Sequence, residues 1–245
     1  MTVTVAAIVS AVAAIELAGL SARLGGPVSP RFIGLAAAVV CVAFVVSDAS
    51  LPTPRVGALA AVLVTVVVAA GAVTLASGPP NAAAFQRAAV SLMGPAYVGL
   101  PLGALATIRA GYGARAFTLL FLLLAVSDSA QYYTGRYAGR RKLAPAVSPA
   151  KTLEGAAGGL LAAAILGAVL GPRWLPGLAP LAGALVGMTL AAVGIMGDLF
   201  ESLLKRSAGV KDSSGLIPGH GGVLDRIDSY LFAAPLYYLF LRYLA

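Results

Sequence analysis

Seven of the nine Asp and Glu residues lie after residue 127, and five of those seven fall within residues 198–228. Asp225 and Asp228 are three residues apart, and Asp198 stands seven residues before Lys205, so each pair shares one face of a helix. Neighbouring carboxylates suit magnesium, which binds one or two of them together with substrate phosphates. Negative charge at the start of a helix also stabilises the helix by itself, so both interpretations stay open.

Basic side chains and glycines fill the interval between these carboxylates. Lys205-Arg206 and Lys211-Asp212 precede a glycine-rich segment, residues 215–222, that contains His220. Backbone N–H groups of glycine approach an anion closely, and ammonium and guanidinium groups neutralise it. The pattern therefore predicts a phosphate-binding loop beside a cation site, which indicates phosphoryl or nucleotidyl transfer.

Several other chemistries are disfavoured by composition. Cys41 and His220 are the only cysteine and histidine, which excludes an internal disulfide and a zinc site built from thiolates and imidazoles. The formal net charge is +8, but aromatic residues make up only 7% and the basic residues stand between apolar stretches. This distribution favours anionic lipid headgroups or a phosphate-rich substrate as partners, and no nucleic acid.

The elements that carry these side chains have the composition of a membrane protein. Hydrophobic residues make up 60% and charged residues 11%, against about 45–50% and about 25% in ordinary globular domains. We predict an all-α polytopic integral membrane protein with about eight transmembrane helices, or seven to nine. The predicted spans are 3–20, 32–47, 56–77, 89–107, 116–133, 156–171, 178–199 and 229–244.

The positions of Lys and Arg predict the orientation. Of the 17 basic residues, twelve fall in the gaps 21–31, 78–88, 134–155 and 200–228, which share one side of the membrane if there are eight spans. Cytoplasmic loops carry the excess of positive charge. We therefore expect loops 134–155 and 200–228, and the active site with them, to face the cytoplasm of a bacterial-type inner membrane.

The stretch from Ser202 to Asp228 closely resembles the C-terminal motif of the phosphatidate cytidylyltransferase family. That motif reads Ser-x-x-Lys-Arg, four residues, Lys-Asp, a Pro-x-His-Gly-Gly turn and Asp-Arg-x-Asp, and every fixed position is filled here at the right spacing. A second block, residues 128–155, resembles the family's Asp-x-x-Ala-Tyr-x-x-Gly and Ser-Pro-x-Lys-Thr-x-Glu-Gly stretches. Gln131 and Leu153 depart from it, standing where Ala and Trp are common.

The resemblance covers about residues 90–240, and the first three spans match only in being apolar. It implies a division into N-terminal transmembrane helices, residues 1–88, and a catalytic transmembrane domain, residues 89–245. It also implies an activity: CMP passes from CTP to phosphatidic acid, giving CDP-diacylglycerol and pyrophosphate in phospholipid biosynthesis. Magnesium is the implied cofactor, with a second metal ion and a homodimer left open.

The resemblance assigns roles residue by residue. Asp198 and Asp225 would bind the metal, and His220 is a hydrogen-bonding group of the turn rather than a proton-transfer group, because the attacking lipid phosphate is already ionised. The implied catalytic residues are Asp198, Asp225, Asp228, Lys205, Arg206 and Lys211. The implied substrate-binding residues are Asp128, Arg140, Ser148, Lys151, Ser202, Asp212, His220, Gly221, Gly222 and Arg226.

Two other functions stay open at this stage. One is cytidylyl or phospho transfer to a different lipid, which uses the same chemistry. The other is membrane transport, with Glu16 and Asp128 as intramembrane carrier groups. A transporter is expected to show internal repeats with broken helices, and the sequence shows no convincing repeat.

Overall fold

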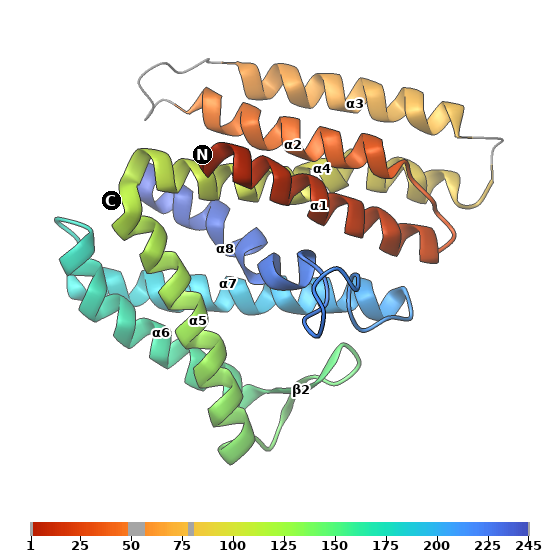
Figure 1. Ribbon diagram of the computed structural model, residues 1–245. Coiled ribbons are helices and arrows are strands. Elements are labelled where there is room, and N and C mark those ends of the chain that lie inside the picture. Colours follow the sequence, from red (N-terminus) through yellow and green to blue (C-terminus); the bar gives the residue numbers. More distant parts are fainter. Residues whose placement is uncertain (1, 49–56, 78–80, 245) are drawn as a thin grey trace. The chain divides into compact units, whose positions relative to one another are not determined.

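The computed structural model describes residues 2–48, 57–77 and 81–244, and within them it contains eight α-helices and one β-hairpin (Figure 1). A five-residue π-helical turn, Ile108–Tyr112, joins α4 to α5. The hairpin pairs β1 (Lys142–Ala144) with β2 (Ser148–Thr152) in antiparallel register. The helices are α1 (Thr2–Arg23), α2 (Pro30–Ser47), α3 (Ala58–Ala76), α4 (Ala84–Thr107), α5 (Gly113–Ala138), α6 (Leu153–Trp174), α7 (Pro180–Ser207) and α8 (Leu224–Tyr243).

The helices are long because their apolar runs must satisfy every backbone polar group internally when they lie in lipid. Six helical stretches are long and apolar enough to cross a membrane by length and composition: 2–23, 30–47, 58–76, 84–138, 153–174 and 180–207. The stretch 84–138 contains both α4 and α5. The prediction of an all-α membrane protein is confirmed, whereas eight as the number of spans stays a prediction. Residue 56 of the third predicted span lies outside the described residues.

The chain forms two compact units, which we describe separately. Unit 1 comprises residues 1–111 and 204–227. In it α2 packs against α1, α3 and α4, and Ile33, Val40 and Val98 are fully buried. Gly99 permits the close approach of α4 to α2, because an added Cβ would lie 2.5 Å from the carbonyl oxygen of Ala37.

Unit 2 comprises residues 112–203 and 228–245. In it α5 packs against α6, and the hairpin contacts both of these helices. Glycines bring α6 and α7 together, because a Cβ added at Gly167 would collide with the backbone of Gly183, and one at Gly187 with the backbone of Ala163. Small residues of this kind are typical of helix packing in lipid.

The two connections predicted at 134–155 and 200–228 are shorter in the structure, because the flanking helices extend into both ranges. Helix α5 continues to Ala138 and α6 begins at Leu153, so the first connection is residues 139–152 and contains the hairpin. Helix α7 continues to Ser207 and α8 begins at Leu224, so the second connection is residues 208–223. The apolar windows ended where charged residues begin, but a helix that leaves the apolar region continues as long as its backbone hydrogen bonds persist.

Candidate functional site

Unit 2 contains a pocket of about 310 Å³ between α5, the hairpin, the start of α6 and α7. Asp128 of α5, Lys151 of β2 and Asp198 of α7 all line it. These three residues are more than 20 positions apart in sequence, and the packing of α5, α6 and α7 brings them to one place. The pocket therefore brings charged side chains of the block 128–155 together with Asp198, which precedes the Ser202–Asp228 motif.

Hydrogen bonds and an ion pair hold the charged groups of this pocket. Lys151 Nζ forms an ion pair with Asp198 Oδ2, and the Ser202 hydroxyl donates to Asp198 Oδ1 at 3.3 Å. Gln131 Nε2 donates to Asp128 Oδ1 at 3.2 Å. One ammonium and two carboxylates thus face a space large enough for part of a phosphorylated ligand.

The position of Lys151 follows from the geometry of the hairpin. Glu154 Oε2 accepts hydrogen bonds from the backbone N–H groups of Arg140 at 3.0 Å and Arg141 at 3.1 Å. These bonds tie the end of α5 to the start of α6. Thr152 caps α6, because its Oγ1 accepts from the Gly155 N–H at 3.0 Å. Lys151 directly precedes this cap and is thereby held at the N-terminal end of α6.

Several residues that line the pocket were not predicted as site residues. They include Gln131, Tyr132, Arg136 and Thr152, and Arg136 Nη1 donates to the Tyr132 hydroxyl at 3.0 Å. Tyr132, Arg136 and Thr152 belong to the second sequence block, so their membership in that block was the available signal. Of the predicted residues in this block, Arg140 and Ser148 are not among those lining the pocket in the described structure.

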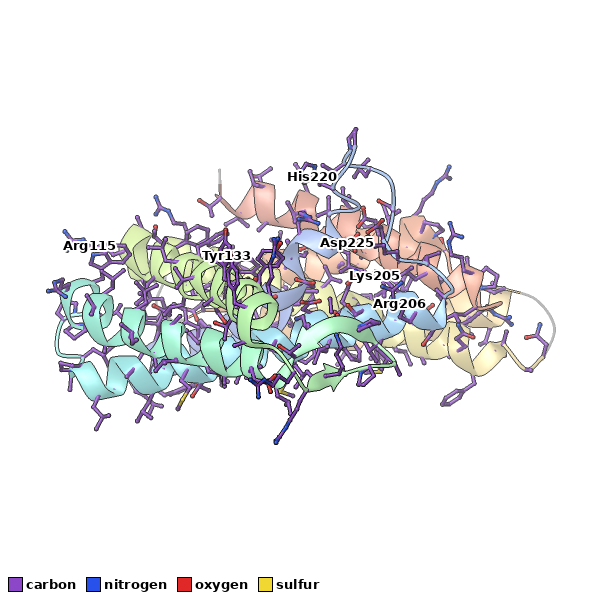
Figure 2. The ribbon with its side chains drawn as sticks, turned by 90° about the horizontal axis from the view of Figure 1, so that it is seen from below. Arg115, Tyr133, Lys205, Arg206, His220 and Asp225 are labelled. Atoms are coloured by element: carbon purple, nitrogen blue, oxygen red, sulfur yellow. The ribbon has the colours of Figure 1, made fainter. Side chains whose placement is uncertain are left out.

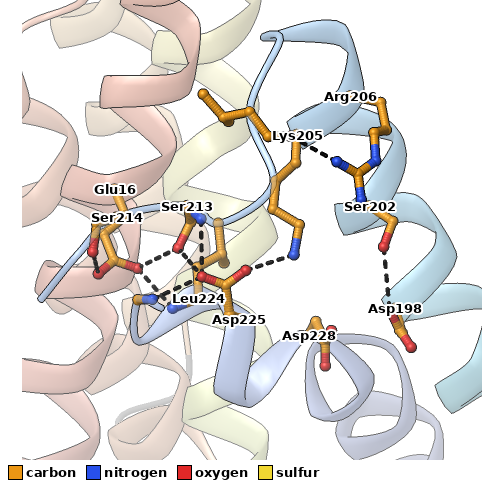
Figure 3. A network of polar contacts seen from close by, with 12 residues as sticks. Glu16, Asp198, Ser202, Lys205, Arg206, Ser213, Ser214, Leu224, Asp225 and Asp228 are labelled. Atoms are coloured by element: carbon orange, nitrogen blue, oxygen red, sulfur yellow. Dashed lines mark hydrogen bonds and ion pairs between the residues drawn. The ribbon is translucent and has the colours of Figure 1, made fainter. Parts of the chain in front are cut away.

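Asp225 is the centre of a second polar cluster, which lies in unit 1 (Figure 3). Lys205 Nζ donates to Asp225 Oδ1 at 2.5 Å. Asp225 Oδ2 accepts from the Gly222 N–H at 2.7 Å, the Ser213 N–H at 2.9 Å and the Ser213 hydroxyl at 2.7 Å. Burial by itself would raise the pKa of Asp225, but Lys205, Gly222 and Ser213 together lower this pKa to about 2.

Glu16 of α1 belongs to the same cluster and was not predicted to be part of an enzyme site. Its Oε1 accepts from the Ser214 hydroxyl at 2.7 Å and the Val223 N–H at 3.0 Å. Its Oε2 accepts from the Leu224 N–H at 2.7 Å and the Ser213 hydroxyl at 3.0 Å (Figure 3). Glu16 therefore caps α8 from a distant part of the chain. A lone carboxylate inside the first apolar run was the only sequence signal.

Glycines shape the connection 208–223, which contains the predicted phosphate-binding loop. Gly219 and Gly221 have φ of 73° and 77°, a region that side chains other than glycine rarely adopt. A Cβ on Gly222 would lie 2.5 Å from Glu16 Oε2 and would collide with the Ser213 hydroxyl. The Ser213 hydroxyl and the Glu16 carboxylate thus occupy the space that a side chain at residue 222 would need.

The remaining predicted residues of this connection lie nearer the surface. Lys211, Asp212 and Arg226 are exposed, and Arg206 Nη1 donates to the carbonyl oxygen of Val210 at 3.2 Å. His220 is exposed at the outer end of the loop (Figure 2), where its Nδ1 lies 3.2 Å from the carbonyl oxygen of Pro218. This contact agrees with a role for His220 in the turn.

The structure thus divides the predicted metal ligands between two units. Asp198 belongs to unit 2, and Asp225 belongs to unit 1. Within the described residues, no group of three or more His, Cys, Asp or Glu side chains is arranged to hold a metal ion. The pairing of Asp198 with Asp225 around one cation therefore stays a prediction.

Several known proteins are similar to part of this chain. The chain is 48% identical over 128 residues to "Uncharacterized protein YnbB" of Escherichia coli and 47% identical over 130 residues to a "Phosphatidate cytidylyltransferase" of Haemophilus influenzae. These alignments cover 51% and 49% of this chain, and 43% of each relative. A "Phosphatidate cytidylyltransferase" of Staphylococcus epidermidis is 39% identical over 163 residues, covering 64% of this chain and 60% of that relative.

The aligned regions span less than half the length of the first two relatives, so these similarities alone leave much of each relative uncompared. The sequence model of the cytidylyltransferase family, in contrast, matches residues 1–244. That match includes the first three helices, for which the sequence motifs offered no resemblance. Because it covers nearly every residue, the chain belongs to the cytidylyltransferase family.

Proposed function

We propose that this protein is a phosphatidate cytidylyltransferase, which transfers CMP from CTP to phosphatidic acid and releases pyrophosphate. The observation that carries the proposal is the pocket of unit 2, where Asp128, Lys151 and Asp198 converge in a chain with only 11% charged residues. Carboxylates and a lysine are costly at the edge of a membrane and are retained where they serve a function. Family membership and the names of two similar proteins point to the same reaction.

Magnesium fits the donor set of this pocket. Asp128 and Asp198 supply carboxylate oxygens, and magnesium takes one or two carboxylates and completes its shell with water and substrate phosphates. Asp225, in contrast, already accepts four hydrogen bonds from Lys205, Ser213 and Gly222. We therefore propose Asp198 as the principal ligand, with Asp128 beside it, whereas a role of Asp225 in binding the metal stays a prediction. When bound, the ion would neutralise charge on the phosphates of CTP.

The side chains of the chain would act by positioning and by charge stabilisation. A phosphate oxygen of phosphatidic acid attacks the α-phosphorus of CTP, a new P–O bond forms, and the bond to the β-phosphate oxygen breaks as pyrophosphate leaves. Lys151 would hold phosphate oxygens in line for this displacement, because an ammonium stabilises the charge that develops in the transition state. Arg136 at the same pocket would contribute a second cation.

The membrane explains how a lipid and a nucleotide could meet here. Eleven of the seventeen Lys and Arg residues lie within residues 134–155 and 200–228 or at Arg23 and Arg87, and such excess marks the cytoplasmic side. We propose that this side carries the active site, since CTP is available there. A homodimer is compatible with this arrangement and is not required by it.

Purified protein in phosphatidic acid-containing micelles with magnesium and CTP tests the proposal. We expect magnesium-dependent release of pyrophosphate and formation of CDP-diacylglycerol. Lack of turnover in protein with a cooperative thermal transition would contradict the proposal. Turnover with another acceptor lipid, but not with phosphatidic acid, would indicate the related transferase function instead.

The hydrogen bonds of Glu16 argue against the transport alternative. A carrier carboxylate must exchange its partners during transport, whereas both oxygens of Glu16 accept from donors of the connection 208–223 and the start of α8. Uptake of CTP into vesicles that contain the reconstituted protein provides the corresponding measurement. Under the proposed function, CTP is converted without accumulating inside the vesicles.

A further inference from the structure

We infer that Glu16 is a positioning residue, which fixes the connection 208–223 and, through Ser213, sets the orientation of Asp225. The inference rests on the proposed function for its effect on turnover, because Asp225 is a predicted catalytic residue. Glu16 itself is 7% exposed and reaches the connection from α1, 197 residues earlier in the chain.

The first argument is the way the donors are distributed. Each oxygen of Glu16 accepts one backbone N–H and one serine hydroxyl: Oε1 takes Val223 and Ser214, and Oε2 takes Leu224 and Ser213. A neutral amide cannot replace this carboxylate. In either orientation of a glutamine amide, its NH₂ group would face one of the two backbone N–H groups. Only a carboxylate offers an acceptor oxygen to both backbone N–H groups.

The second argument is that Ser213 contacts both carboxylates. Its hydroxyl oxygen lies 3.0 Å from Glu16 Oε2 and 2.7 Å from Asp225 Oδ2 (Figure 3). A serine hydroxyl has one proton, so it donates to one carboxylate at a time. The Ser213 backbone N–H also donates to Asp225, at 2.9 Å. A displacement of Ser213 therefore moves Asp225, and Glu16 is what holds Ser213 from the other side.

The third argument is the close packing of Gly222. Its backbone N–H donates to Asp225 at 2.7 Å, and its Cα lies so near Glu16 and Ser213 that an added Cβ would collide with them. The next two N–H groups, of Val223 and Leu224, donate to Glu16. Three consecutive backbone N–H groups are thus divided between the two carboxylates, so the placement of one depends on the other.

Four variants separate positioning from general stabilisation: Glu16→Gln, Ser213→Ala, the double variant, and Ser214→Ala as the matched control. Ser214 donates to Glu16 without contacting Asp225 in any described hydrogen bond. We expect Glu16→Gln and Ser213→Ala each to lower kcat by about tenfold or more, with the KM for CTP changed less than about threefold. The kcat of the double variant should be no lower than that of the less active single variant, because both changes remove the same chain of contacts to Asp225. Ser214→Ala should retain kcat within about threefold.

Hydrogen–deuterium exchange gives a readout that needs no turnover. In Glu16→Gln we expect faster exchange of the Ser213 and Gly222 amides, which donate to Asp225, as well as of the Val223 and Leu224 amides. Unchanged exchange at Ser213 and Gly222, or a kcat loss for Ser214→Ala equal to that for Ser213→Ala, would overturn the inference. If the wild type forms no CDP-diacylglycerol, the proposed function fails, and the exchange pattern alone decides the role of Glu16.

Discussion

Lys151 and Asp198 form the ion pair through which β2 and α7 meet at the pocket. The pair is half-buried, so its contribution to stability is small compared with what its charges can do for a bound phosphate. An ammonium that faces a carboxylate can exchange that partner for a phosphate oxygen when a substrate arrives. We therefore expect Lys151 to matter more for the binding of a phosphate in the pocket than for the stability of the fold.

Lys151→Ala should lower kcat/KM for CTP by about tenfold to a thousandfold, because one charge-assisted contact to the transition state is lost. Lys142→Ala is the matched control, since Lys142 is an exposed lysine of the same hairpin. It removes the same charge and should keep kcat/KM within about threefold. Equal losses in the two variants would show that only the net charge of the hairpin matters.

Lys205 and Asp225 make a different kind of pair, because both side chains are buried, at 10% and 5% exposure. Removing one partner of such a pair costs about 3–5 kcal/mol, whereas replacing both can be nearly neutral. Asp225→Asn should therefore abolish turnover and also lower the Tm. Adding Lys205→Met should restore much of the Tm and none of the activity. Recovery of activity in the double variant would refute a direct role for Asp225.

The pKa of Asp225 adds a pH dependence to this comparison. Because the pKa falls from 3.8 to about 2 on folding, the stabilisation is fully present above pH 3.8 and is lost as the pH falls through 2. The difference in Tm between the wild type and Asp225→Asn should be constant from pH 5 to 7 and shrink below about pH 4. A difference that already changes near pH 6 would point to another titrating group.

At the scale of elements, the connection 208–223 is held by side chains rather than by regular structure. Ile217 and Gly221 form a single antiparallel bridge, and Glu16, Asp225 and Arg206 supply side-chain hydrogen bonds to the connection. This arrangement explains why glycine occupies residues 219, 221 and 222. Residues 219 and 221 have a positive φ, and a Cβ at residue 222 would collide with Ser213 and Glu16.

Gly222→Ala should therefore displace the connection, lowering kcat at least about tenfold and destabilising the protein by about 1–3 kcal/mol. Gly215→Ala is the control, because no heavy atom lies within 4 Å of the Cβ that it would add and its φ is not in the positive range. Activity assays and thermal unfolding of both variants give the comparison. A Gly222→Ala enzyme with wild-type turnover would mean that the loop tolerates rearrangement.

At the scale of the whole molecule, the two connections that carry the site residues should lie on one side of the membrane. We predict that single cysteines at Ala146 and Leu216 are labelled by an impermeant maleimide from the cytoplasmic side, and one at Ala179 from the other. All three positions are exposed, and the wild-type Cys41 is buried and serves as the unlabelled control. Labelling of Ala146 and Leu216 from opposite sides would contradict the predicted topology.

Much of this molecule could be predicted from local patterns. Runs of apolar residues predicted a helical membrane protein, because a backbone in lipid has few alternatives to the helix. The spacing of Asp198, Lys205, Asp225 and Asp228 predicted phosphate and cation chemistry, because residue types and helical periodicity are both properties of short stretches. The hairpin at 142–152 was not predicted, since strands of three and five residues carry little periodicity.

Only the tertiary structure decided which of these residues meet. Asp128, Lys151 and Asp198 share a pocket because α5, α6 and α7 pack through small residues, and Glu16 contacts Ser213, which lies 197 positions later in the chain. No periodicity connects residues so far apart. The sequence determined that the chain is an apolar helical protein with retained phosphate-binding groups. Packing determined that Glu16 of α1 holds the connection that precedes α8, because a buried carboxylate must find its donors wherever the fold places them.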